Sequence, residues 1–97
     1  MSVRHMQINL YTHEGCVNCK KVKVNLQRIL PEMGFNYNST VKELDIDDPD
    51  ILADLLMLDT EQVPTICAGN ASLTGKEIMD EATLRTFLSE QLKKNDQ

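Results

Sequence analysis

The change in hydrophobic period at Gly15 is the feature that most restricts the fold of this chain. Before this glycine, residues 6–12 alternate apolar and polar side chains, as in a β-strand with one buried face. After it, apolar residues recur every three or four positions, as on the buried face of an amphipathic helix. These residues are Val22, Leu26, Ile29 and Met33. We therefore predict a strand that leads through a short loop into a helix, which starts near Val17 and ends between Pro31 and Gly34.

The next segment predicts a second strand and a second helix. Residues 41–46 alternate again, which indicates a strand. Asp48 is a helix-capping residue and Pro49 suits the first helical turn, so we expect a helix over residues 49–58. Two strands with a helix between them form a right-handed crossover, which makes these strands parallel.

The last third of the chain predicts a hairpin and a final helix. Residues 63–68 and 71–75 are expected to be two strands joined through Gly69–Asn70. Asp80 can cap a helix whose apolar stripe is Leu84, Phe87, Leu88 and Leu92. The predicted order is β-α-β-α-β-β-α, an α/β fold with a four-stranded mixed sheet flanked by helices. We expect residues 1–97 to form a single domain, because a chain of 97 residues is long enough for one hydrophobic core and too short for two.

Composition and charge argue against several classes of protein. A net charge of −5 disfavours binding to nucleic acid, which rewards clustered positive charge. The longest apolar cluster, around Leu52–Leu58, is interrupted by Asp54, so we expect no association with a membrane. Three cysteines are an odd number, and the first ten residues have no secretory pattern. We therefore expect the protein to lie in the reducing cytoplasm. We also expect it to be a monomer.

Cys16 and Cys19 lie three residues apart at the predicted start of the first helix. Unpaired amides and the helix dipole stabilise an anion there, which favours the thiolate of Cys16. Cys19 lies one turn further along, where fewer amides are free and less surface is exposed. The spacing permits a disulfide after a small approach of the two side chains. We predict that Cys16 attacks a disulfide and that Cys19 resolves the intermediate, with Lys20 and Lys21 adding positive potential.

Two other interpretations of these cysteines remain open at this point. Cys16, Cys19, Cys67 and His13 provide the three thiols and one imidazole of a structural zinc site, and the same thiols could hold an iron–sulfur cluster. Zinc frameworks usually pair two such motifs, however, and the remaining ligands here are single. The other alternative is a pair of packed, inert thiols. We favour redox chemistry, and we expect Cys67 to be a buried small hydrophobic residue.

Three short motifs in this order resemble the thioredoxin superfamily, and more narrowly the glutaredoxin-like redoxins. They are YTHEGCVNC after the first strand, Val63-Pro64-Thr65 before the third, and GNASLTG in the closing hairpin. The resemblance spans nearly the whole chain. It implies a dithiol–disulfide oxidoreductase of the electron-transport kind, which uses no bound cofactor and has glutathione as a candidate co-substrate.

The resemblance also implies a substrate site around the dithiol. The residue that matches Pro64 is cis in this family and faces the dithiol, and the backbone at Val63 would pair with an extended segment of the substrate. Tyr11 would flank the dithiol, with packing in the core or at an edge as the alternative. The implied substrate-binding residues are Tyr11, Val17, Asn18, Val63, Pro64 and Thr65.

Departures from the family pattern bear on the partners. The chain has no tryptophan, and His13 and Glu14 replace the lysine and proline that are common before the dithiol. Val17 is similar to the residue of the NrdH-redoxins, which reduce ribonucleotide reductase. The motif that holds glutathione is only partly matched, by Gly75, Lys76 and Glu77. We expect protein disulfides as substrates, ribonucleotide reductase as a candidate partner, and thioredoxin reductase rather than glutathione as the efficient reductant.

Overall fold

A four-stranded sheet organises the protein, in a computed structural model that describes residues 7–69 and 71–93. The strands are β1 (Ile8–Thr12), β2 (Val41–Asp45), β3 (Thr65–Ala68) and β4 (Ala71–Thr74), in the spatial order β2-β1-β3-β4. β1 pairs in parallel with β2 and antiparallel with β3, and β3 pairs antiparallel with β4. The sheet is therefore mixed, as predicted.

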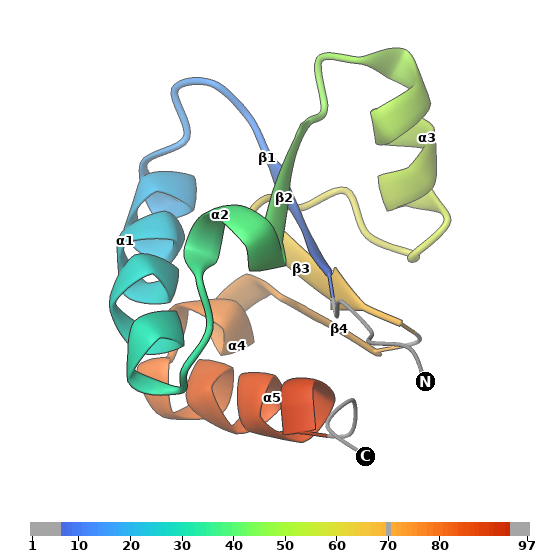
Figure 1. The fold of residues 1–97 in the computed structure, drawn as a ribbon. Helices are drawn as coiled ribbons and strands as arrows, with labels where there is room; N and C mark the ends of the chain where they lie inside the picture. The colour runs from blue at the N-terminus through green and yellow to red at the C-terminus, as the bar shows by residue number, and fades with distance from the viewer. Residues whose placement is uncertain (1–6, 70, 94–97) are drawn as a thin grey trace.

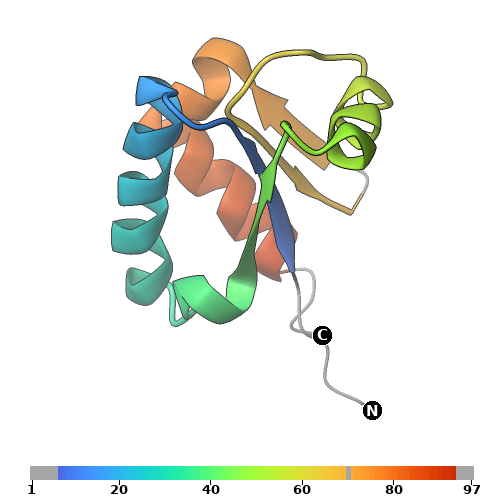
Figure 2. The same cartoon turned by 90° about the horizontal axis from the view of Figure 1, so that it is seen from above.

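Helices lie on both faces of this sheet, but unequally (Figures 1 and 2). α1 (Val17–Glu32), α4 (Gly75–Met79) and α5 (Glu81–Lys93) cover one face, whereas α3 (Pro49–Leu56) lies alone on the other. α2 (Tyr37–Thr40) leads directly into β2. In the described ranges, no helix is both long enough and apolar enough to cross a membrane.

The main core lies between the sheet and the layer of α1, α4 and α5. Alternate residues of β1 point into it, and Ile8 and Leu10 are completely buried. The predicted helical stripes also face this core, except that Met33 is only partly buried at its edge. The helical residues of this core that are fully or almost fully buried are Val22, Leu26, Ile29, Leu30, Ile78, Leu84, Leu88 and Leu92.

The other face of the sheet is covered only in part. Leu55 of α3 is fully buried against it, while Leu52, Leu56 and Met57 are exposed. Cys67 points toward this face, because its neighbours Ile66 and Ala68 point into the main core. The expectation that Cys67 is buried is therefore wrong. It is half-buried because α3 covers too little of the sheet to enclose it.

Two short helices are missing from the predicted order of elements. α2 is a single turn capped by Asn36, whose Oδ1 accepts a hydrogen bond from the amide of Asn38 at 2.8 Å. One turn is too short to show a helical period. α4 begins at Gly75, which we expected to end the second strand of the hairpin. The φ angle of Gly75 is +65°, a left-handed conformation that favours glycine and that turns the chain out of the sheet.

Several predicted boundaries are confirmed and others differ. The strand expected over residues 41–46 ends at Asp45, and the helix expected over residues 49–58 ends at Leu56. Asp48 and Asp80 cap α3 and α5, accepting hydrogen bonds from the amides of Asp50 at 2.9 Å and Thr83 at 3.1 Å. β3 begins at Thr65 and not at position 63, because Pro64 has no N–H to donate to a neighbouring strand. Met6 of the first predicted strand and Asn70 of the hairpin turn lie outside the described residues.

Truncation of the core side of α1 tests this architecture. We expect Leu26→Ala to lower the free energy of unfolding by about 2–5 kcal/mol, because Leu26 is completely buried and its removal leaves a cavity. Val24→Ala is the matched control, since Val24 lies on the same helix with 60% of its surface exposed. Urea unfolding of both variants measures the difference, and equal losses of stability would contradict the assigned core.

Candidate functional site

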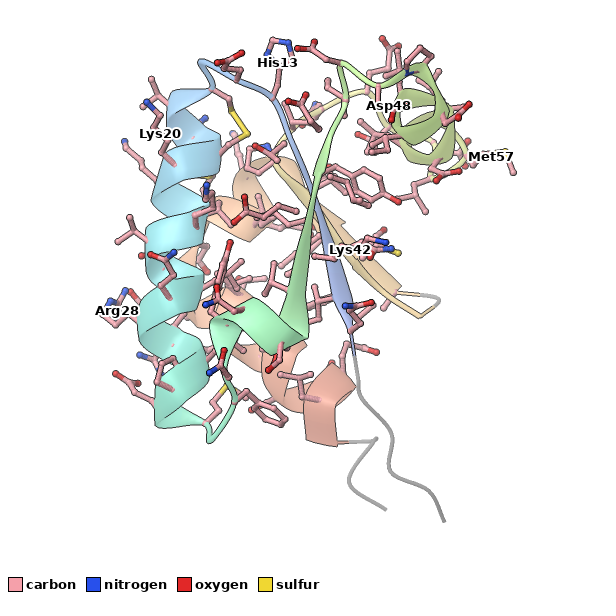
Figure 3. All side chains as sticks on the ribbon, turned by 45° about the horizontal axis from the view of Figure 1, so that its top comes forward. His13, Lys20, Arg28, Lys42, Asp48 and Met57 are labelled. Atoms are coloured by element: carbon pink, nitrogen blue, oxygen red, sulfur yellow. A yellow bond between two sulfur atoms is a disulfide. The ribbon has the colours of Figure 1, made fainter. Side chains whose placement is uncertain are left out.

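The loop from β1 to α1 carries the two cysteines. Gly15 has a φ angle of +85°, which lets the chain turn sharply between strand and helix. The amide of Cys16 donates a hydrogen bond to the carbonyl oxygen of His13 at 3.1 Å, which closes this turn. Cys16 is the N-cap residue of α1, one position before the first helical turn in which we expected it. Figure 3 shows the pair beside the loop that bears His13.

Cys16 and Cys19 are joined by a disulfide, with their Cα atoms 5.2 Å apart. The amide of Cys19 also donates to Sγ of Cys16 at 3.0 Å, so the sulfur occupies the position of a capping oxygen. Cys16 is half-buried, whereas Cys19 exposes only 2% of its surface. Cys19 is therefore the less accessible of the two, as expected from its place one turn along the helix.

The loop before β3 meets the dithiol from the other side. Sγ of Cys16 lies 4.0 Å from the carbonyl oxygen of Val63, although 47 positions separate them. The Val63–Pro64 peptide bond is cis, as the resemblance implied. A groove of about 370 Å³ passes this loop, lined by Asn18, Gln62, Val63, Pro64, Gly75, Lys76 and Met79. Three of the predicted substrate-binding residues thus lie together.

The other three predicted residues have different surroundings. Val17 is 65% exposed next to Cys16, so it belongs to the same surface. Thr65 is completely buried, and its hydroxyl hydrogen-bonds the carbonyl oxygen of Gln62 and the hydroxyl of Thr74, each at 2.7 Å. It holds the loop before β3 in place and presents no surface to a substrate.

Tyr11 does not line the dithiol hollow or the groove at Pro64. It is 4% exposed and points away from the main core, because Leu10 beside it points inward. Burial raises the pKa of its phenol, and the nearby groups Cys67 and Asp54 raise that pKa further. Tyr11 is therefore packed in the interior on the face of the sheet that α3 covers, which is the packing alternative to a place beside the dithiol.

A hollow of about 580 Å³ borders the dithiol, with charges of both signs. His13 contacts Asp47 at 3.0 Å across its rim. Glu43 is held by Lys23 at 3.3 Å and by the hydroxyl of Tyr37 at 2.7 Å. Lys20 lines this hollow, whereas Lys21 lies outside it.

Sequence reasoning missed Glu43, Asp45, Gln62 and Met79 as residues near the dithiol. The two acids could have been found, since β1 and β2 are parallel and pair Thr12 with Asp45, so both strands end at the same edge. Met79 had no such signal, because it belongs to the unpredicted helix α4.

The four residues considered for zinc are not brought together. Among residues 7–69 and 71–93, no group of three or more His, Cys, Asp or Glu side chains is arranged to hold a metal ion. His13 faces Asp47, and Cys67 lies in β3 with its sulfur 3.7 Å from the carbonyl oxygen of Gly69.

Comparison with known proteins supports the fold. The sequence matches no protein-family model and no curated protein. The structure is similar to a glutathione S-transferase from the Antarctic clam Laternula elliptica, with a TM-score of 0.53 and 21% identity. The match covers 92% of this chain and 36% of that chain, so this chain spans about a third of the transferase. At this identity the likeness concerns the fold alone, which is thioredoxin-like.

Thiol labelling tests the surroundings of the cysteines. With the disulfide closed, we expect iodoacetamide to modify Cys67 alone, and slowly at neutral pH, because burial raises the pKa of this thiol. A raised pKa delays formation of the reactive thiolate, so the rate should increase with pH above the ordinary thiol range. Peptide mapping by mass spectrometry measures the rate, with protein unfolded in urea as the control. Equal rates in folded and unfolded protein would contradict the burial of Cys67.

Proposed function

We propose that this protein is a thiol–disulfide oxidoreductase that reduces disulfides of other proteins. The observation that carries the proposal is the asymmetry of the dithiol. Cys16 is accessible at the start of α1, and the almost buried Cys19 lies within bonding distance beneath it. A pair of inert packed thiols would not need one sulfur at the surface.

The reaction consists of two exchanges of sulfur–sulfur bonds. The thiolate of Cys16 attacks one sulfur of the partner disulfide, which forms a mixed disulfide and releases the other partner sulfur as a thiolate that takes up a proton. The thiol of Cys19 then loses its proton and attacks Sγ of Cys16. The second partner thiol leaves, and the protein holds the Cys16–Cys19 disulfide. Two electrons and two protons have passed to the partner.

The start of α1 favours the thiolate of Cys16. The amide of Cys19 points at this sulfur from 3.0 Å, and the first turn of the helix contains no acidic residue. Its unpaired amides and the helix dipole both stabilise negative charge. Lys20 adds a positive charge at the edge of the same hollow. The same sulfur is thereby a better nucleophile in the first step and a better leaving group when the pair is reduced again.

The partner segment is proposed to lie along the loop before β3. Val63 precedes the first residue of β3, so its backbone can pair with an added extended strand. Asn18 and Lys76 also line this groove. Ribonucleotide reductase is the candidate partner that the resemblance at Val17 implies, and it is one of the disulfide proteins with which the activity can be assayed.

Substitution of each cysteine tests the assigned roles. Cys16→Ser should abolish disulfide reduction, because it removes the accessible thiol of the dithiol pair. Cys19→Ser should accumulate a mixed disulfide with the substrate, which non-reducing electrophoresis and mass spectrometry detect. Cys67→Ala is the control and should keep full activity. The roles would be reversed if Cys19 alkylated faster than Cys16 in the reduced protein near neutral pH.

The electron donor can be decided by parallel kinetics. We expect efficient reduction of the disulfide by thioredoxin reductase and slow reduction by glutathione. Glu14, Glu43 and Asp45 line the dithiol hollow and disfavour an anionic tripeptide, whereas exposed Val17 offers an apolar contact to a protein. The similar structure is a glutathione S-transferase, which makes glutathione the alternative donor to test. A higher kcat/KM with glutathione would overturn this choice of donor and leave the dithiol chemistry in place.

A further inference from the structure

A second groove runs along the exposed side of α1, next to the dithiol. It has a volume of about 530 Å³, and its lining is mainly apolar. Val17 and Val24 expose 65% and 60% of their surfaces there, which is unusual for two valines on one helix. Lys20, Lys21 and Asn25 form its polar side, and Met79 of α4 closes it.

Met79 connects this groove with the one at Val63 and Pro64. The same side chain lines both, and the adjacent residues Val17 and Asn18 each line one of them. A segment bound at Pro64 therefore has a continuous path past Met79 and onto α1. Together, the two grooves can hold a longer segment of the partner than the few residues that flank its disulfide.

The charges along this path are positive in an acidic protein. The net charge of the chain is −5, yet Lys20 and Lys21 face the groove on α1 and Lys76 lines the groove at Pro64. Within the described ranges, none of these three lysines forms an ion pair. By contrast, Arg28 and Arg85, further from the dithiol, both pair with Glu81. The unpaired cations are thus concentrated where a partner would lie.

We propose that the disulfide segment of the partner protein continues from the Val63–Pro64 groove past Met79 onto α1, and that it is apolar and acidic. An apolar side chain fits between Val17 and Val24, and a carboxylate pairs with Lys21 or Lys20. This inference rests on the proposed function and adds the class of substrate. The protein should reduce disulfides flanked by acidic and apolar residues faster than disulfides flanked by basic residues.

The length of the path limits where these side chains occur in the partner. Val17 and Val24 are two turns apart, which corresponds to ~10 Å along a helix. An extended segment covers this distance in about three residues. The apolar side chain and the carboxylate therefore lie within about four residues of the reactive cysteine of the partner.

Single-turnover reduction of short peptides tests the proposal. Fully reduced protein is mixed with peptide disulfides that carry Leu and Glu, Leu and Lys, or Ser and Glu within four residues of the cysteine, in both chain directions. Each rate is divided by the rate of the same peptide with dithiothreitol, which removes differences in intrinsic reactivity. We expect the Leu–Glu peptide to react about fivefold faster than the Leu–Lys peptide at low salt, with a smaller ratio at high salt.

Variants on the exposed side of α1 locate the preference. Lys21→Glu should reverse the preference between Glu and Lys, and Val24→Gln should remove the advantage of Leu over Ser. Lys42→Glu is the matched control, because it makes the same change of charge on the opposite side of β2 from α1 (Figure 3). It should keep the preference of the unchanged protein. Lys20 is left unchanged, since it also borders the dithiol hollow.

The outcomes separate this inference from the proposed function. If folded, reduced protein reacts with none of the peptides and not with hydroxyethyl disulfide, the proposed function fails and the inference fails with it. If all peptides are reduced at equal normalised rates, or the lysine peptide is preferred, the inference alone is overturned. The same holds if Lys42→Glu changes the preference as much as Lys21→Glu.

Discussion

The pairing of β1 with both of its neighbours determines how the site is assembled. β1 is an inner strand, parallel to β2 and antiparallel to β3, and its inward side chains are completely buried. Tyr11 pairs with Thr65, so the chain before β3 leaves the sheet at the edge where β1 ends. The dithiol follows β1 by four residues, and Pro64 precedes β3 by one. Strand register thus brings Cys16 and Val63 to one place.

Acidic and basic residues are concentrated in different parts of the chain. Residues 43–75 contain eight acidic residues and no basic one, and they include α3 with its exposed leucines. Four of the ten lysines and arginines belong to α1, which lies on the opposite face of the sheet from α3. The dithiol lies where these two regions meet, which explains the mixed charges of its hollow. A partner that approaches along α1 meets positive charge, and one that approaches over α3 meets negative charge.

Local signals predicted most elements, and their failures have physical causes. The caps Asp48 and Asp80 act through neighbouring amides, so the sequence alone could identify them. α2 and α4 were missed because helices of 4 and 5 residues contain too little of a period. Tyr11 was assigned to the dithiol by resemblance. Its alternation with inward-pointing Leu10 places it on the other face of the sheet.

The sequence by itself determined what lies within one helical turn or one strand. It defined the dithiol, since the helix that follows Cys16 holds the Cα atoms of the two cysteines 5.2 Å apart whatever the rest of the chain does. It also defined which side chains alternate into the core. Only the tertiary structure decided that Val63 faces Cys16, that Met79 connects two grooves, and that Cys67 is half-exposed. Those contacts depend on strand register and on how far a distant helix covers the sheet, and no local pattern encodes either.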